Sequence, residues 1–165
     1  MGAAFVGLGS NLDTREENLE QALSLLQARG FRLTSLSAVY ETAPVGGPPQ
    51  GDFLNQAVGG DWPGPPESLL LACLSVEREL GRVRRERFGP RRIDLDVLLF
   101  GDEMRDGEFE LPHPRLHERR FVLAPLCEIA PEARHPRLGL TVRELLLRCP
   151  DTARVLRHSL LEPRG

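Results

Sequence analysis

Hydrophobic and polar positions along the chain fall into short runs that predict a series of strands and helices. Apolar or alternating runs at residues 3–8, 31–40, 53–58 and 93–100 are typical of strands. Leucines and alanines at helical spacing predict a helix that follows the capping-box pair Thr14 and Glu17 and stops at Gly30. A second helix is predicted over residues 67–80, where Gly81 supplies the stop. The predicted order is therefore strand, helix, two strands, helix and strand.

The rest of the chain has a less regular pattern. Residues 111–114 read as a proline-bracketed turn, and short apolar helices are predicted over residues 121–129 and 142–147. The order β-α-β-β-α-β is that of ferredoxin-like folds. We therefore expect an α+β protein with a ferredoxin-like βαββαβ core, a mixed or antiparallel sheet and additional C-terminal helices. No repeat, linker or low-complexity segment divides the chain, so residues 1–165 are expected to form a single domain.

Two segments rich in glycine and proline interrupt these elements. Residues 42–51, TAPVGGPPQG, predict a long shaped loop, and residues 59–66 predict a turn. Trp62 lies in this turn and is expected to anchor packing.

Composition and charge restrict the function classes. The net charge of −3 disfavours general nucleic-acid binding, for which a basic domain is expected. The three cysteines form no CxxC pair, which argues against a zinc site or a disulfide framework. His135 and His158 have no functional context and are expected on the surface. Without a signal-like segment or a long apolar run, we expect a soluble cytoplasmic protein with no membrane partner.

The strand at residues 93–100 carries the first candidate chemistry. Alternation is expected to place one set of residues on one face and a second set on the other. The first set is Ile93, Leu95, Val97 and Leu99, and the second is Asp94, Asp96, Leu98 and Phe100. Two neighbouring carboxylates repel each other unless a cation lies between them, and Mg²⁺ takes one or two carboxylates together with substrate phosphates. The alternative interpretation, the solvent face of an edge strand, remains open for Asp-x-Asp alone.

An arginine-rich segment directly precedes this strand. Its cations are Arg82, Arg84, Arg85, Arg87, Arg91 and Arg92, with a turn at Gly89 and Pro90. Arginine side chains match phosphate oxygens geometrically, although arginine runs are more often solvated surface. Because the arginine segment directly precedes the Asp-x-Asp strand in sequence, the two motifs together favour a site for a metal-bound polyphosphate.

Other residues could complete such a site. His113 lies between two prolines that fix its direction, and phosphate contact is slightly favoured over a structural role. Phe53 and Asn55 share a strand face and could stack on and hydrogen-bond a flat heterocycle, although a core role for Phe53 is equally open. Leu12 stands where a dinucleotide-binding glycine would be, and no P-loop exists, so metal and arginine would have to hold any phosphate.

Residues 87–98, RFGPRRIDLDVL, resemble the signature of the 6-hydroxymethyl-7,8-dihydropterin pyrophosphokinase family of folate biosynthesis. The resemblance continues through Glu77 with Gly81 and Arg82, and through residues 9–12, 40–44, 53–55, 112–115 and 119–131. The chain departs from the family pattern at three positions, with Phe88 in place of tryptophan, Leu74 in place of glutamine and Pro114 in place of tyrosine.

The resemblance implies transfer of pyrophosphate from ATP to the pterin hydroxymethyl group with release of AMP, and two Mg²⁺ ions held by Asp94 and Asp96. It implies catalytic roles for Arg82, Arg91, Asp94 and Asp96. The implied ATP contacts are Glu77, Arg82, Arg84, Arg87, Arg91, Val97, His113 and Arg119. The implied pterin contacts are Thr42, Ala43, Pro44, Val45, Phe53, Asn55, Phe88, Asp94 and Phe121. The expected partners are ATP and 6-hydroxymethyl-7,8-dihydropterin, with a monomeric chain and no nucleic acid.

Two other function classes fit the sequence less well. An Asp-x-Asp nucleotidyltransferase would place Gly-Ser just before its carboxylates, whereas Gly9 and Ser10 lie far upstream of Asp94. A ferredoxin-like RNA-binding module would carry an aromatic stripe on its strands, but only 5% of the residues are aromatic.

Overall fold

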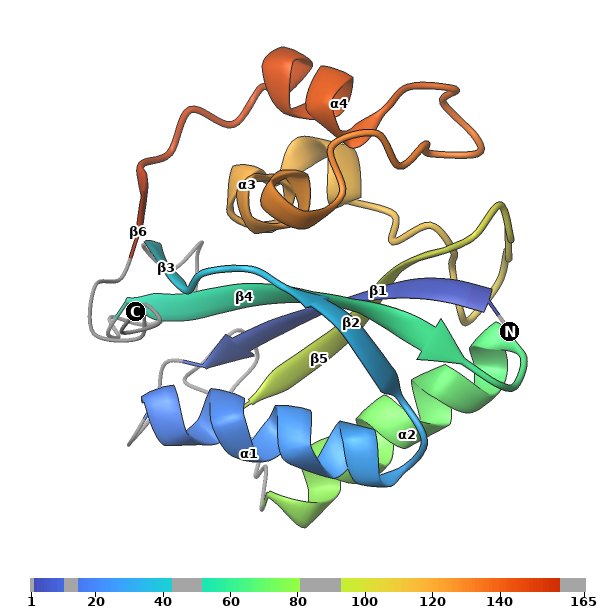
Figure 1. Ribbon diagram of the computed structural model, residues 1–165. Helices are drawn as coiled ribbons and strands as arrows, with labels where there is room; N and C mark the ends of the chain where they lie inside the picture. The colour runs from blue at the N-terminus through green and yellow to red at the C-terminus, as the bar shows by residue number, and fades with distance from the viewer. Residues whose placement is uncertain (1, 11–14, 43–51, 81–92, 158–165) are drawn as a thin grey trace.

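The computed structural model describes residues 2–10, 15–42, 52–80 and 93–157 (Figure 1). Its elements, in chain order, are β1 Gly2–Ser10, α1 Arg15–Ala28, β2 Arg32–Leu36, β3 Tyr40–Thr42, β4 Phe53–Trp62, α2 Pro66–Glu79, β5 Asp94–Phe100, the 3-10 helix η1 Leu116–Glu118, α3 Arg120–Ile129, α4 Val142–Arg148 and β6 Val155–Arg157.

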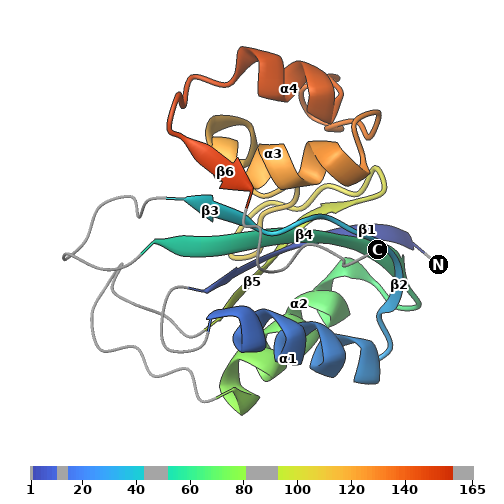
Figure 2. The same ribbon diagram turned by 60° about the vertical axis from the view of Figure 1, so that its left-hand side comes forward.

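The strands form one six-stranded sheet in the order β5-β1-β4-β3-β6, with β2 also paired to β4. Each strand pairing within the described residues is antiparallel. Helices α1 and α2 cover one face of the sheet, and α3 covers the other, with α4 packed on the outer side of α3 (Figures 1 and 2). The expected α+β, ferredoxin-like arrangement with additional C-terminal helices is confirmed.

Two hydrophobic cores lie on the two faces of the sheet. The core under α1 and α2 includes Val6 and Leu8 of β1, Leu69 of α2 and Leu95 of β5. The core under α3 and α4 includes Leu98 of β5 with residues of both helices, among them Leu123 and Val142. Each fully buried leucine or valine contributes about 1.5–3 kcal/mol relative to an exposed side chain. Because both faces of the sheet are packed in this way, β5 is held from both sides.

A bulge in β5 corrects the expected alternation at its C-terminal end. Phe5 pairs with Leu99 but the next residue, Val6, pairs with Val97, so Leu98 is the extra residue. As a result Leu98 and Leu99 both pack in the core under α3, and Phe100 packs in the core under α1 and α2. The alternation of residues 93–97 is as expected.

The strand predicted over residues 31–40 is two strands, because long-range contacts interrupt it. The backbone N–H of Ser37 donates to the carbonyl of Ala57 at 2.9 Å, and the Ser37 hydroxyl accepts the N–H of Ala57 at 2.9 Å. The N–H of Ala38 donates to Glu128 of α3, also at 2.9 Å. These bonds take residues 37–39 out of the strand between β2 and β3.

The turn predicted over residues 59–66 begins four residues later, because β4 runs on to Trp62. Its glycines are needed for close packing: a Cβ on Gly59 would collide with Ser35, and one on Gly60 would collide with the carbonyl of Arg32. Trp62 therefore ends a strand, where it is buried and donates a hydrogen bond from Nε1 to the Ser68 hydroxyl at 2.8 Å. Its expected packing role is confirmed.

The C-terminal part agrees with the pattern in its helices and differs at one histidine. Thr141 and Glu144 form a capping box at the start of α4. His135 is only 4% exposed, so its expected surface position is wrong. No helix within the described ranges has the length and apolar character needed to cross a membrane.

Candidate active site

Asp94 and Asp96 lie on β5, the strand at one edge of the sheet. Leu95 and Val97 pack into the core under α1 and α2, so the two carboxylates project from the opposite face. The directly paired residues on β1 are Gly9 for Asp94 and Gly7 for Asp96. Paired residues share a face, and a glycine adds no side chain there. The side chain of Leu98 lies against Gly7, and the side chain of Asn55 lies against Gly9.

Glu77 fixes the backbone between the two aspartates. This residue of α2 is 5% exposed, and its Oε2 accepts the backbone N–H of Leu95 at 2.9 Å. A carboxylate bonded to an edge-strand N–H contributes more than a neutral acceptor would. Glu77 therefore acts, at the least, as a support for the segment that carries Asp94 and Asp96.

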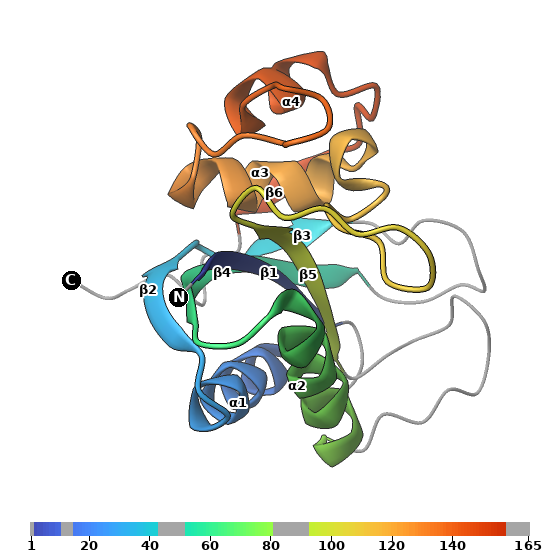
Figure 3. The same cartoon turned by 90° about the vertical axis from the view of Figure 1, so that its right-hand side faces the viewer.

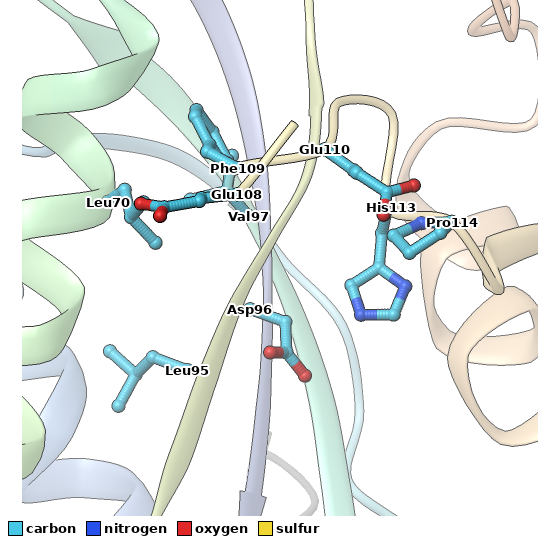
Figure 4. A pocket seen from close by; sticks show the side chains of 9 residues that line it. All are labelled: Leu70, Leu95, Asp96, Val97, Glu108, Phe109, Glu110, His113 and Pro114. Atoms are coloured by element: carbon cyan, nitrogen blue, oxygen red, sulfur yellow. The ribbon is translucent and has the colours of Figure 1, made fainter. Parts of the chain in front are cut away.

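His113 lies on the same side of β5 as the Asp96 carboxylate (Figure 4). Its backbone N–H donates to Leu98 at 3.1 Å, and its Nδ1 accepts the N–H of Arg115 at 3.3 Å. In the neutral ring the proton is then on Nε2, which is a donor. Burial lowers the pKa of His113, Asp96 opposes this shift, and Arg119 adds to it. The ring is therefore a neutral hydrogen-bond donor at pH 7.

Arg119 brings a cation to the same region. It stands directly before α3, and its guanidinium carbon lies 5.6 Å from the centroid of the Phe121 ring, within cation–π range. Burial and the neighbouring Arg115 lower the pKa of Arg119, and Asp96 opposes them. An arginine stays charged under such shifts, so the field at Asp96 includes a fixed positive charge.

A second group of residues lies across the sheet on the same face as Asp94. Gly9 pairs with Asp94 on one side and with Asn55 on the other, so these residues form a row. Two interstrand spacings separate Asp94 from Asn55, which is about 10 Å. The Asn55 Nδ2 donates to the Thr42 hydroxyl at 2.6 Å, which leaves its Oδ1 towards Gly9, where an added Cβ would lie 3.0 Å away. The amide is thus fixed in orientation at the open end of the sheet.

Phe53 lies near this amide, and both Phe53 and Phe121 lie outside the buried cores. Phe53 pairs with Thr42, and its Cδ1 lies 3.9 Å from the position of a Cβ on Gly9. Both rings are partly exposed, and neither packs in either core cluster. This placement agrees better with ring stacking than with a plain core role for Phe53.

A pocket of about 210 Å³ lies beside the edge strand β5 (Figure 4). Its lining residues are Leu70, Leu95, Asp96, Val97, Glu108, Phe109, Glu110, His113 and Pro114. The sequence did not single out Leu70, which lies within the predicted helix, or residues 108–110, where the pattern is irregular and the family resemblance skips residues 99–111. Val97 was predicted to contact ATP, and it forms part of this wall although it is mostly buried.

Several predicted site residues lie outside the described part of the chain. They are Arg82, Arg84, Arg87, Phe88 and Arg91 of the arginine segment, and Ala43, Pro44 and Val45 of the glycine- and proline-rich loop. Among the residues that are described, no group of three or more histidine, cysteine, aspartate or glutamate side chains could hold a metal by itself. Two carboxylates on one face, with room for phosphate oxygens, still fit the donor set of Mg²⁺.

Comparison with known proteins identifies the family. A model of the family described as 7,8-dihydro-6-hydroxymethylpterin-pyrophosphokinase matches residues 5–131. Over 128 residues the chain is 48% identical to a 2-amino-4-hydroxy-6-hydroxymethyldihydropteridine pyrophosphokinase of Bacillus subtilis. The match covers 76% of this chain and 77% of that one. Over 148 residues it is 47% identical to a protein of the same name from Methylorubrum extorquens, covering 88% and 92% of the two chains.

Solved structures show the same fold. The wild-type HPPK-DHPS of Plasmodium falciparum matches with a TM-score of 0.68 at 15% identity, and the match covers 89% of this chain and 44% of that chain. This chain thus spans less than half the length of that solved protein, and at such low identity the likeness concerns the fold alone. The family model and the bacterial relatives carry the assignment: the chain belongs to the 7,8-dihydro-6-hydroxymethylpterin-pyrophosphokinase family.

Proposed function

We propose that this chain transfers pyrophosphate from ATP to the hydroxymethyl group of 6-hydroxymethyl-7,8-dihydropterin and releases AMP, a step of folate biosynthesis. One observation of the structure carries the proposal. Asp94, Gly9 and Asn55 form a row on one sheet face. This row supports the proposal, because a carboxylate that could bind a metal-bound phosphate lies in line with an amide, oriented by Thr42, that could bind a heterocycle. Membership of the family favours this function over nucleotidyl transfer and over RNA binding.

The nucleotide would bind along β5. The pocket beside β5 offers apolar walls from Leu70, Val97 and Phe109, which suit a purine nucleoside. The triphosphate would then extend towards Asp96, where the Nε2–H of His113 and the guanidinium of Arg119 are donors to phosphate oxygens. The remaining ATP contacts stay predictions from the resemblance, and they are Glu77, Arg82, Arg84, Arg87 and Arg91.

Asp94 and Asp96 are the proposed ligands of Mg²⁺, with two ions as the expected number. Bound there, Mg²⁺ would neutralise charge on the phosphate oxygens and favour ionisation of the pterin hydroxyl. The two carboxylates hold fixed positions because Glu77 and β1 fix the backbone of β5. The proposed Mg²⁺ would therefore bind at one fixed position on the sheet.

The pterin would lie between Phe53 and Phe121, with the Asn55 Oδ1 accepting hydrogen bonds from its ring edge. Contacts of Thr42, Ala43, Pro44, Val45 and Phe88 with the pterin stay predictions. In this position the hydroxymethyl group faces the carboxylates across Gly9, because Asp94 and Asn55 flank that glycine.

The reaction is a phosphoryl-type displacement. The hydroxymethyl oxygen forms a bond to the β-phosphorus of ATP, and the bond from that phosphorus to the oxygen bridging to the α-phosphorus breaks. AMP leaves with the bridging oxygen, and the hydroxyl proton is released. Negative charge develops on the phosphoryl oxygens, and the cation at Arg119 and the donor at His113 stabilise it by position and charge.

Incubation with ATP, Mg²⁺ and the hydroxymethyl pterin, followed by separation of the nucleotide products, tests the proposal. We expect AMP and the pyrophosphorylated pterin in equal amounts. Release of free pyrophosphate with a nucleotidylated product would instead indicate the nucleotidyltransferase. The monomeric state, the absence of nucleic-acid partners, the single domain and the cytoplasmic location stay predictions, and light scattering in solution tests the first.

A further inference from the structure

The chain between β5 and His113 forms a hairpin that carries one wall of the pocket. The backbone N–H of Arg105 donates to Leu111 at 2.9 Å, and the N–H of Leu111 donates back to Arg105 at 3.1 Å. Gly107, with a φ of +104°, lies in the turn. We name residues 105–111 the wall hairpin, because Glu108, Phe109 and Glu110 within it line the pocket (Figure 4). The position of this hairpin sets the shape of the pocket.

On one side the wall hairpin is fastened to α2. The Arg105 guanidinium forms an ion pair with Glu67 near the start of that helix. Both side chains reach solvent, and exposed ion pairs contribute little to rigidity. The Leu111 arm is also held by burial, since Leu111 lies in the core under α1 and α2 and Phe109 packs against that core. A further attachment at Arg105 would fix the other arm to it.

Arg137 supplies that attachment from the C-terminal part of the chain. Its Nη2 lies 2.9 Å from the Arg105 carbonyl oxygen and 3.3 Å from the Leu111 carbonyl oxygen, the two residues that close the hairpin. The same nitrogen lies 2.9 Å from a carboxylate oxygen of Asp106. A charged donor shared by both carbonyls at the neck of the hairpin holds its two arms together.

The backbone that carries Arg137 is itself fixed by a buried histidine. The Nδ1 of His135 accepts the N–H of Arg137 at 3.2 Å and that of Leu138 at 3.3 Å. The N–H of Gly139 donates to the His135 carbonyl, and the N–H of His135 donates to Leu140, both at 2.8 Å. Burial lowers the pKa of His135, which keeps its Nδ1 available as an acceptor. Arg137 is therefore presented on a tight loop and loses little freedom when it binds the hairpin.

We propose that Arg137 is a positioning residue that fixes the wall hairpin and thereby sets the affinity for the nucleoside of ATP. The proposal rests on the proposed function, which places that nucleoside in the pocket beside β5. Arg137 lies beyond residues 5–131, so the family match does not cover it. Apart from Asp94, the described pterin residues lie on β3, β4 and the start of α3, so we expect pterin binding to be independent of Arg137.

Three variants separate this role from a general effect on stability. Arg137→Gln removes the charged donor, and Arg137→Lys keeps the charge without the guanidinium geometry. Arg134→Gln is the matched control, because Arg134 lies on the same loop and donates to Gly139 at 3.0 Å instead of to the hairpin. Fluorescence of Trp62, the sole tryptophan, verifies that each variant is folded.

Hydrogen exchange of the protein without ligands measures the anchoring directly. In Arg137→Gln we expect the amides of Arg105 and Leu111 to exchange about tenfold faster, as the loss of a charge-assisted hydrogen bond predicts. Exchange in β4 should not change. Arg134→Gln should behave as wild type, and equal exchange in wild type and Arg137→Gln would overturn the anchoring.

Steady-state kinetics measure its consequence. In Arg137→Gln we expect the KM for ATP to rise about tenfold while kcat and the KM for the pterin stay within about twofold. Arg137→Lys should lie between this variant and wild type. Normal AMP formation with an unchanged KM for ATP in Arg137→Gln overturns this proposal alone. A wild-type protein that forms no AMP overturns the proposed function, and the role in ATP affinity with it.

Discussion

The two faces of β5 differ in polarity, although alternate residues of one short segment form them. Ile93, Leu95 and Val97 are buried under α1 and α2, whereas Asp94 and Asp96 stand on the opposite face beside glycines of β1. Figure 3 shows the helix pairs on either side of the sheet, with β5 at its edge. Over residues 93–97 one face packs in the core and the other carries the charges, whereas Leu98 and Leu99 pack on the second face further along the strand. A strand alternates its side chains every residue, so rigid packing and exposed carboxylates lie within a few ångströms of each other.

Substituting the carboxylates should produce the largest functional effect and leave the packed face intact. We expect Asp94→Ala and Asp96→Ala each to lower turnover on the order of 10³-fold, because each removes a proposed metal ligand at the reacting phosphates. Thermal unfolding should be unchanged or slightly higher in temperature, since a repulsion is removed. AMP formation and calorimetry measure the two quantities. Near-normal turnover in either variant would exclude the metal assignment.

Substituting the neighbour on the other face should have the reverse outcome. Leu95→Ala creates a cavity in the core under α1 and α2, and we expect it to lower the free energy of unfolding by about 2–5 kcal/mol. Denaturant titration followed by Trp62 fluorescence measures this change. Because Leu95 also lines the pocket beside β5, the KM for ATP should rise as well, whereas kcat of the molecules that remain folded should stay within a few-fold of wild type. A variant that is fully stable yet inactive would show that the two faces are not separable.

The aromatic residues test whether the open face extends to the pterin. We expect Phe53→Ala and Phe121→Ala each to weaken pterin binding by about 1–3 kcal/mol, the range found for stacking of bases on aromatic rings. ATP affinity should hardly change. Calorimetric titration with each ligand separates the two effects. If the variants lose stability but bind pterin normally, the rings belong to the packing.

Tyr40 lies on the same sheet face as the candidate site, but it contributes to packing. Burial, together with a hydrogen bond to Glu128 and the charge of that carboxylate, raises the pKa of Tyr40 to about 12. The folded protein therefore holds the phenol proton between pH 10 and 12, where the unfolded chain loses it, so stability falls as the pH rises through this range.

Ultraviolet absorbance can follow this ionisation directly, because Tyr40 is the sole tyrosine. We expect a midpoint near pH 12 in the folded protein, near 10 in denaturant, and a lower midpoint in folded Glu128→Gln. A folded-state midpoint equal to that of the denatured chain would show that the bond between β3 and α3 does not form.

Local sequence patterns were sufficient to predict the bounds of those elements that depend only on residues nearby in the sequence. Helix α2 and strand β5 match their predicted bounds within a residue, and Asp94 and Asp96 share the expected face. The predictions that were wrong depend on contacts between distant residues. The glycines of β4 look like a turn until the close approach of β2 is known, and the bulge at Leu98 depends on the register with β1.

The residues of the candidate site also divide into those that a sequence motif predicts and those that no motif predicts. Phe53, Asn55, Asp94, Asp96 and His113 carry motifs, and each occupies a position that fits its predicted role. The wall hairpin and Arg137 carry none, because irregular segments packed against each other leave no periodic signal. Leu70 lies within the predicted helix, where the pattern does not distinguish a pocket residue from a packing residue. The buried position of His135 was missed for a different reason: its partners are backbone groups of its own irregular loop, which no pattern reveals.

The pairing of β6 with β3 has a consequence for solubility. An uncovered strand exposes N–H and C=O groups that can pair with a second molecule and start aggregation. Val155–Arg157 occupies that side of Tyr40–Thr42, and the outer strand that results is only three residues long and ends in an arginine (Figure 2). Short, charged outer strands are poor templates for intermolecular pairing. The segment that follows α4 thus covers the outer edge of β3, at the side of the sheet remote from the carboxylates.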